Sequence, residues 1–331
     1  MVMSEIRRTA VGLVVALLLV LAVGAGANAN ERYALGELVV QMAEGESIDI
    51  VNGQFGTVDI QHLPQLNVYQ LNVSTAQDLE VTAAQIEALP QVVFCHPNYL
   101  IDPLNTVQSS LPVSDELHTG DYLNQPAVEE LRLAEAQALS RGANVKVAVL
   151  DGGVEYGHPA FGGKAVSGYD YVDDDYDASD EPGGPNSGHG TFVAGVIHLV
   201  APDAVIRSYR VTNVLGESDG YIVAEAILQA VADGCQVINL SMVTMDEHKG
   251  ITSALQYARD HGVLTVAAAG NGQEESARYP ASDANAIGVA AVDSNLTLAD
   301  FSNFGQYVDI CAPGTEIYGP YQDGGYAWWD H

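Results

Sequence analysis

Basic residues are scarce in this sequence. Its 331 residues include 12 Lys and Arg against 43 Asp and Glu, which gives a formal net charge of −31. So few cations cannot form the basic surface by which proteins bind nucleic acid, and this class of partner is excluded. The acidic excess favours solubility and is compatible with bound cations. Hydrophobic residues make up 47% of the chain, which is enough to build a sizeable core.

Cysteine is also rare, with Cys95, Cys235 and Cys311 as the three examples. So few cysteines exclude a fold that depends on a disulfide scaffold. Each one lies in an apolar, strand-like run, and we expect all three to be buried as small hydrophobic residues. A Cys235–Cys311 disulfide stays open at this point, because sequence alone does not place the two Cα atoms.

The most apolar stretch of the chain lies at its N-terminus. Arg7 and Arg8 precede an apolar run from Ala10 to Ala27, and the run closes on Ala27-Asn28-Ala29. This pattern is typical of a secretory signal peptide over residues 1–29, and it predicts an extracellular or periplasmic protein. A membrane anchor of about 20 apolar residues is the alternative. The glycines of the run and its Ala-x-Ala ending favour cleavage, which would leave no stable membrane anchor.

Residues 30–105 follow a regular order of strand, helix, strand, strand, helix and strand. The clearest elements are strands at Glu37–Met42, Asn67–Val73 and Val92–Ile101, and a helix at Thr75–Leu89 with Thr75 as its expected N-cap. Two βαβ-like halves of this size predict a small α+β domain of the ferredoxin-like type. Residues 106–125 are polar and lack periodicity, so we expect a linker there.

Helical and strand-like runs alternate from residue 126 to residue 331. After a helix expected at Pro126–Leu139, the Val-rich run Ala143–Leu150 is typical of a strand buried on both faces of a parallel sheet. The alternation predicts an α/β fold with a doubly wound, mainly parallel sheet, whose ligands bind at the carboxyl ends of the strands. The later runs are Thr191–Val200, Val205–Val211, Ile222–Asp233, Val237–Met242, Ile251–His261, Val263–Ala268, Ala286–Val292 and Tyr307–Ile310.

A histidine between two glycines opens one helical run, in the segment Gly188–Gly195. Glycines permit a sharp turn and the close approach of other segments. The uncharged run Thr191–Val200 predicts a buried helix, so His189 would lie at a helix N-terminus and face a cleft. An imidazole in such a place can act as a general acid or base. For a lone histidine the alternative is a core residue bonded to a backbone carbonyl.

Two further polar residues end buried strands. Asp151 ends the first strand, where its carboxylate could accept a hydrogen bond from His189; a turn or helix cap is the alternative. Asn271 follows the strand of tiny residues Val266–Gly270, along which a peptide could lie as an added strand. Its amide could then donate to a developing oxyanion, the alternative being a turn residue before Gly272.

Four segments, in order, resemble the motifs of the subtilisin-like serine peptidases, or subtilases. The string HGTFVAG, which begins at His189, is similar to the histidine motif of that family. Three other segments match further motifs, at Val147–Val154, Val237–Met242 and Ala267–Asn271. The resemblance extends from the first predicted strand to the end of the chain.

The resemblance implies a serine endopeptidase that acts on protein and peptide substrates by an Asp-His-Ser mechanism. Asp151 and His189 would be catalytic, Asn271 would serve the oxyanion hole, and no cofactor would be required for the chemistry. Residues 30–105 would be an inhibitor I9-type propeptide, which helps the catalytic domain (residues 126–331) to fold and places its tail in the active-site cleft. Cleavage would fall in residues 106–125.

The residues implied to bind substrate are Ser241, Met242, Ala268, Ala269 and Gly270. Val243 stands where the family has glycine and would reshape the S1 pocket, so no P1 preference is carried over. Gly152 replaces the usual Thr or Ser after the catalytic aspartate. Ser218–Gly220 is a further candidate for the strand that pairs with substrate, and the Tyr279–Pro280 bond is a candidate cis peptide.

The acidic segment Asp170–Asp177 could bind Ca²⁺ as a structural ion through its carboxylates, with a solvated charged loop as the alternative. Ala160 stands where the family commonly supplies a calcium ligand, so the metal ligands stay unknown.

The nucleophile of the family is missing from the 331 residues. The segment Asp309–Gly314 matches the family motif that precedes the serine, and Ala327–Asp330 aligns with the residues just before Gly-Thr-Ser. We therefore expect a truncated and inactive peptidase precursor. A non-enzymatic inhibitor or folding chaperone is the first alternative. A metal-dependent hydrolase is the second, but it needs a metal-ligand spacing such as H-x-x-x-H, which is not found around His189.

Overall fold

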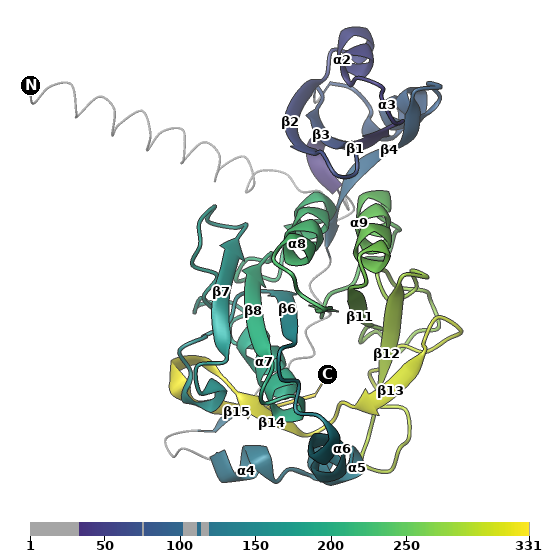
Figure 1. Ribbon diagram of the computed structural model, residues 1–331. Helices are drawn as coiled ribbons and strands as arrows, with labels where there is room; N and C mark the ends of the chain where they lie inside the picture. The colour runs from purple at the N-terminus through teal and green to yellow at the C-terminus, as the bar shows by residue number, and fades with distance from the viewer. Residues whose placement is uncertain (1–32, 75, 102–110, 114–118, 331) are drawn as a thin grey trace, which may run out of the picture.

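The computed structural model describes residues 33–74, 76–101, 111–113 and 119–330 (Figure 1). The signal peptide expected at residues 1–29 lies outside this part of the chain. None of the helices in the described ranges is both long and apolar enough to cross a membrane.

The N-terminal domain is a four-stranded antiparallel sheet with two helices. Its strands lie in the order β2-β3-β1-β4, and its predicted order of elements is confirmed. The elements are β1 (Tyr33–Met42), α2 (Asp49–Phe55), β2 (Val58–Leu63), β3 (Val68–Asn72), α3 (Leu79–Glu87) and β4 (Val92–Ile101). Leu38, Val40, Leu71 and Ile86 pack in its core. Asp78 caps α3, with its carboxylate accepting from the Val81 N–H at 3.1 Å; the predicted cap Thr75 is outside the described residues.

The C-terminal domain is built on a seven-stranded parallel sheet, as the sequence predicted. The strand order is β13-β12-β11-β10-β6-β8-β7. The strands are β6 (Lys146–Asp151), β7 (Ala165–Asp170), β8 (Val205–Arg210), β10 (Val237–Leu240), β11 (Leu264–Ala268), β12 (Ala286–Val292) and β13 (Ile310–Pro313). Helix α7 (His189–Val200) covers one face of the sheet, and α8 (Gly220–Ala232) and α9 (Lys249–Asp260) cover the other (Figure 1).

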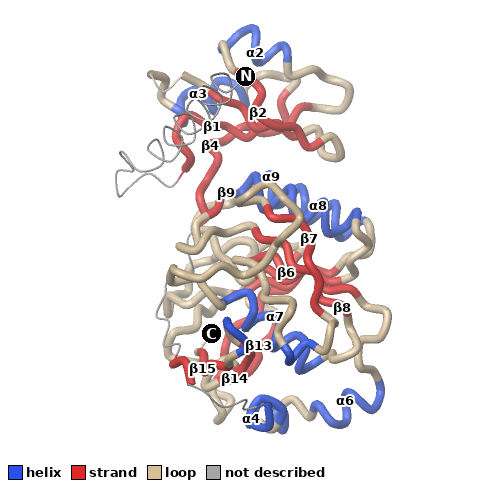
Figure 2. The backbone as a smooth tube through the Cα atoms, turned by 90° about the vertical axis from the view of Figure 1, so that its left-hand side faces the viewer, coloured by secondary structure: helices blue, strands red, loops and turns tan. Residues whose placement is uncertain are grey.

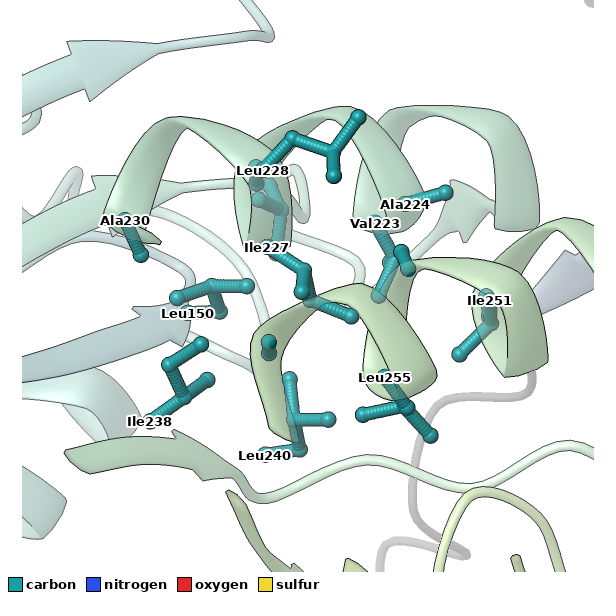
Figure 3. Packing of buried hydrophobic residues seen from close by; sticks show 14 of the residues in the cluster. Leu150, Val223, Ala224, Ile227, Leu228, Ala230, Ile238, Leu240, Ile251 and Leu255 are labelled. Atoms are coloured by element: carbon teal, nitrogen blue, oxygen red, sulfur yellow. The ribbon is translucent and has the colours of Figure 1, made fainter. Parts of the chain in front are cut away.

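Strand β6 shows why its run of apolar residues is continuous. Leu150 packs with α8 and α9 in the main core (Figure 3). Ala148 belongs to the same core. Val149, between them, packs on the opposite face with Ala194 of α7. A strand covered on both faces has no solvent side, so its polar residues are displaced to its ends.

The segment expected to be a linker contains regular structure. Strand β5 (Leu111–Val113) pairs with β15 (Tyr326–Trp329), which pairs in turn with β14 (Ile317–Pro320). Helix α4 (Thr119–Leu123) follows β5. The single helix predicted over Pro126–Leu139 is wrong. It is divided into α5 (Pro126–Glu130) and α6 (Leu133–Leu139), because Arg132 between them takes a left-handed conformation with φ of 52°. Short 3₁₀ turns occupy Pro159–Phe161 and Gln322–Gly324.

The cysteine predictions need correction at one residue. Cys95 and Cys235 are buried, but Cys311 is exposed, and all three are free thiols. Cys311 lies on the edge strand β13, whereas Cys235 precedes β10, with β11 and β12 between. Three strand spacings amount to roughly 14 Å, far beyond the Cα separation of about 7 Å that a disulfide can span. The Cys235–Cys311 bridge is therefore not formed.

The two domains meet at the N-terminal ends of α8 and α9. Both helices lie between the antiparallel sheet and the parallel sheet (Figure 1). Strand β4 runs from the N-terminal domain toward the C-terminal one (Figure 2). There Leu100 and Ile101 pair antiparallel with Asp219 and Ser218, which form the two-residue strand β9 (Ser218–Asp219). The second domain thus adds the short strand β9 to the edge of the antiparallel sheet of the first domain, next to β4.

Candidate active site

Asp151 and His189 form a buried hydrogen-bonded pair. Asp151 is the last residue of β6 and His189 is the first of α7. The His189 Nδ1 atom lies 2.7 Å from Asp151 Oδ1, which also accepts from the Gly152 N–H at 2.7 Å. The side chain of His189 is 5% exposed and that of Asp151 is 3% exposed. Water is thus largely excluded from the pair, which strengthens its interaction.

The glycines on either side of His189 allow this approach. A Cβ on Gly190 would lie 2.1 Å from the carbonyl oxygen of Gly153, so α7 can meet the end of β6 only without a side chain there. Gly188 has φ of 85°, and a Cβ on it would lie 2.0 Å from the ring of Tyr321. Both glycines are therefore required by packing.

The electrostatic surroundings of His189 favour its protonated form. Burial by itself would lower the pKa of this imidazole, but the charge and hydrogen bond of Asp151 outweigh that effect, with a further contribution from Asp180. The net result is a pKa raised above the ordinary value for histidine. A carboxylate that stabilises an imidazolium in this way makes the histidine a better proton acceptor.

An apolar cavity of about 300 Å³ lies beside His189. The walls come from α7 and from the carboxyl ends of the central strands, and Asn271 is among them. Of the residues predicted to bind substrate, four line this cavity: Ser241, Ala268, Ala269 and Gly270. Met242 does not, because its side chain is 4% exposed and packs in the main core.

Asn303 shapes the loop that carries Asn271, and sequence reasoning missed this residue. Its Oδ1 accepts from the backbone N–H groups of Gly272 and Glu274 at 2.8 and 3.1 Å, and its Nδ2 donates to the Ala269 carbonyl at 3.0 Å. Asn303 is 1% exposed. The one available signal is the small, polar pair Ser302-Asn303 before Gly305, which is typical of a turn.

Asp180 is a second carboxylate near the pair that sequence reasoning missed. It accepts from the Thr191 hydroxyl at 2.5 Å, from the Gly188 N–H at 3.0 Å and from Gln322 Nε2 at 2.9 Å. Burial raises the pKa of Asp180 to about 6, although these hydrogen bonds act in the opposite direction. Asp180 lies in an acidic loop nine residues before His189, where it is one of many carboxylates, so the sequence does not single it out.

Comparison with known proteins identifies the family. The Subtilase family (peptidase S8) profile matches residues 142–328, more than half of the chain. The chain belongs to the subtilase family. A thermophilic serine proteinase of Bacillus sp. (strain AK1) is 32% identical over 302 residues, which are 86% of this chain and 71% of that protein. Thermitase of Thermoactinomyces vulgaris is 35% identical over 209 residues, 60% and 73% of the two chains.

The N-terminal domain of this subtilase is a prodomain. Residues 22–98 match the profile of the fervidolysin N-terminal prodomain. The crystal structure of fervidolysin from Fervidobacterium pennivorans aligns over 92% of this chain and 53% of that one, with a TM-score of 0.74. Its sequence identity is 24%, so this likeness supports the fold. The narrower I9 type stays a prediction.

The acidic loop of the subtilase is organised around Arg210. This guanidinium is 3% exposed and lies 2.9, 2.6 and 2.7 Å from carboxylate oxygens of Asp170, Asp173 and Glu181. Within the described ranges, no group of three or more His, Cys, Asp or Glu side chains could hold a metal ion. The calcium site stays a prediction. The loop's most buried carboxylate, Asp170, is neutralised by an arginine.

Two further segments of the peptidase domain have the backbone geometry that the sequence suggested. The Tyr279–Pro280 peptide bond is cis. Thr244 and Tyr279 exchange backbone hydrogen bonds of 2.7 and 3.1 Å, which join the segment that follows β10 to this turn. Ser218 and Asp219 do form an edge strand, and in this structure the prodomain pairs with it.

Proposed function

We propose that this chain is the precursor of a secreted subtilisin-like serine endopeptidase, with Asp151, His189 and Asn271 in its active site. The observation that carries the proposal is the 2.7 Å contact between His189 Nδ1 and Asp151 Oδ1. Because a carboxylate only accepts hydrogen bonds, Nδ1 carries the proton of the neutral ring, and Nε2 holds its lone pair. His189 is therefore in the tautomer that a general base requires.

The proposed reaction assigns one step to each residue. A serine hydroxyl attacks the scissile carbonyl while His189 Nε2 takes up its proton and then gives it to the leaving amine. Asp151 holds the ring in place and stabilises the imidazolium. The Asn271 amide, together with the backbone N–H of the serine, donates to the oxyanion. This chemistry needs no cofactor, and Ca²⁺ is proposed at most as a structural ion.

We further propose that these 331 residues are inactive by themselves. They contain no Gly-Thr-Ser-x-Ala-x-Pro motif. The apolar cavity beside His189 has Phe192, Val196 and Ala290 among its lining residues, and an apolar segment carrying the serine would fill it. The nucleophile would then be supplied by sequence beyond residue 331.

A peptide-nitroanilide assay tests the inactivity. We expect the purified 331-residue protein to show no turnover beyond a residual level. Turnover that is abolished by both Asp151→Asn and His189→Ala would contradict inactivity while supporting the assigned base.

The sequence that follows codon 331 tests the assignment of the base. We expect the missing motif in one of the reading frames. A chain extended through it should hydrolyse the substrate, and His189→Ala in that chain should abolish the activity. An extended chain whose activity survives His189→Ala would overturn the assignment.

The prodomain is the proposed partner of the cleft. Its last described residues, Leu100 and Ile101, already pair with the edge strand at Ser218 and Asp219. This pairing also favours the alternative of a protein that inhibits or helps to fold another subtilase. If residues 31–112 inhibit a related subtilase tightly while the extended chain stays inactive, the alternative is correct.

A further inference from the structure

Two buried histidines meet where the prodomain rests on the peptidase domain. His96 belongs to β4 of the prodomain, and His248 is the N-cap residue of α9. Their ring centroids are 4.5 Å apart, with the rings nearly perpendicular. His96 is 7% exposed and His248 is 1% exposed. The catalytic proposal uses neither residue.

The hydrogen bonds of His248 require a neutral ring. Its Nδ1 accepts from the Ile251 N–H at 3.2 Å, and its Nε2 lies 3.4 Å from the Asn98 Oδ1, to which it donates. A proton on Nδ1 would turn an acceptor into a donor that faces the Ile251 N–H. Protonation would therefore remove the cap of α9.

The hydrogen bonds of His96 also suit a neutral ring. Its Nδ1 lies 2.7 Å from the carbonyl oxygen of Pro97, to which it donates. Its Nε2 is buried and has no hydrogen-bond partner among the described residues. A second proton would place an unpaired cationic N–H inside the domain interface, at a large desolvation cost.

The helix ends around His248 add to this cost. Its ring fits between Gly220 and Gly250, where added Cβ atoms would lie 2.1 and 3.0 Å from ring carbons. Gly220 begins α8 and Gly250 lies in the first turn of α9. The N-termini of helices carry partial positive charge, so a cation between two of them is repelled by both.

The charged groups near the two rings already have partners of their own. Lys249 lies 2.7 Å from Glu87 of the prodomain. Glu37 accepts from Gln70 and Asn98 at 2.7 and 3.0 Å. Asp219 accepts from two N–H groups of α8. Further titratable neighbours are Tyr99, whose ring is stacked on that of His96, and Asp246 and Glu80, whose charges act on Tyr99.

The pKa values follow this geometry. Burial lowers the pKa of His96 to about 4, with Lys249 acting in the same direction and the Pro97 hydrogen bond and Glu87 in the other. Burial, followed by the charge of His96, lowers the pKa of His248 well below its ordinary value. Once the domains separate, His96 and the side of His248 that it covers reach water, so the pKa of both rings rises. His248 stays beside the N-termini of α8 and α9, so its pKa rises less than that of His96. The separated state thus binds more protons than the docked state, and acid favours it.

We propose that His96 and His248 form a proton-sensitive latch, which holds the prodomain on the peptidase domain at neutral pH and releases it in acid. Release begins below about pH 6.5, where free histidine becomes charged. Each histidine that is neutral when docked shifts the equilibrium by up to about tenfold per pH unit. This latch regulates the active site of the proposed function, because the released strand β4 would leave the edge strand β9 unpaired.

One carboxylate at the interface titrates in the opposite sense. Burial raises the pKa of Asp219, against its hydrogen bonds from α8 and Asn98. Its protonation in acid stabilises the docked state and therefore weakens the response of the latch. An Asp219→Asn variant keeps a capping oxygen for α8 and removes this titration. We expect this variant to open more steeply with falling pH than the natural chain.

Hydrogen exchange on the full 331-residue chain tests the latch. Protection is corrected for the intrinsic pH dependence of exchange and compared between pH 7.0 and 5.5. Protection at Leu100–Ile101 and Ser218–Tyr221 should fall by up to about a hundredfold, since two histidines contribute over one pH unit. Protection in β10 and β11 should change by less than about threefold.

The matched variant is the double substitution His96→Phe and His248→Asn. Phenylalanine keeps a ring between Phe94 and Tyr99, and asparagine keeps an N-cap acceptor. We expect its interface protection to be independent of pH. If the double variant does not fold, His96→Phe alone is the test. It should at least halve the logarithm of the change in interface protection between pH 7.0 and 5.5. His62→Phe, on the far strand β2, should respond like the natural chain.

Three outcomes overturn the latch. They are a wild-type interface that keeps its protection at pH 5.5, a double variant that opens as the wild type does, and an equal loss of protection in β10 and β11. None of these measurements requires catalysis. A failure of the proposed peptidase function would appear as an inactive extended chain in the nitroanilide assay and would leave the exchange result unchanged. A failure of the latch would appear in the exchange measurement alone.

Discussion

The Nδ1 atom of His189 lies 2.7 Å from Oδ1 of Asp151, although the two residues are 38 positions apart in the sequence. The contact joins the end of a central strand to the start of a buried helix. It raises the pKa of His189 in the folded state above the value of an unfolded histidine. The stabilisation is therefore fully present below about pH 6.5 and is lost as the pH rises through the folded-state pKa.

Asp151→Asn should lower the pKa of His189, because it removes the neighbouring negative charge and leaves the effect of burial. NMR titration of the His189 ring nitrogens measures this change. Asp260→Asn, at the exposed end of α9, is the control and should leave the His189 titration unchanged. An unchanged His189 pKa in Asp151→Asn would show that the pair does not interact in solution.

Gly190→Ala should destabilise the peptidase domain, because the new Cβ would lie 2.1 Å from the Gly153 carbonyl oxygen. Overpacking of this kind costs about 1–3 kcal/mol, against a gain in helix propensity of about 1 kcal/mol. The net loss measured by urea unfolding should be up to about 2 kcal/mol, near the upper end because the clash is with a backbone atom. Gly157→Ala is the control, since its Cβ would meet nothing within 4 Å, and it should be neutral. Equal stabilities of the two variants would contradict the packing argument.

The arrangement of the central sheet could be predicted because its signals are local. The apolar run of β6 ends at Asp151, and His189 begins α7. In a parallel sheet, residues at strand ends and at the starts of the following helices lie together at the carboxyl end of the strands. Asn303 and Asp180 could not be found in this way. Their roles depend on backbone N–H groups supplied by distant loops, and sequence does not show which loop approaches which.

The errors in the sequence interpretation have a similar origin. The helix over residues 126–139 has a continuous helical composition, but Arg132 takes a left-handed conformation that no glycine or proline signals. Cys311 lies in an apolar run and was therefore expected to be buried. It is exposed because its strand forms the edge of the sheet, and strand order is a property of the whole domain.

Arg210→Met should destabilise the fold more than any exposed ion pair would. It leaves Asp170, 1% exposed, as a buried charge without its partner, which costs about 3–5 kcal/mol. Arg141→Met is the control, because its pair with Asp203 is exposed and contributes about 0–1 kcal/mol. Urea unfolding of both variants measures the difference. A loss below 1 kcal/mol for Arg210→Met would mean that solvent reaches the acidic loop.

Thiol labelling should separate Cys311 from the other two cysteines. Cys311 is exposed on an edge strand, whereas Cys95 and Cys235 are 4% and 2% exposed. Burial also raises the pKa of the Cys95 and Cys235 thiols, so little of the reactive thiolate is present at neutral pH. A coloured aromatic disulfide reagent should therefore react at once with one thiol of the native protein and with three after unfolding. Cys311→Ser should abolish the rapid phase, and rapid labelling that persists in this variant would place one of the other cysteines at the surface.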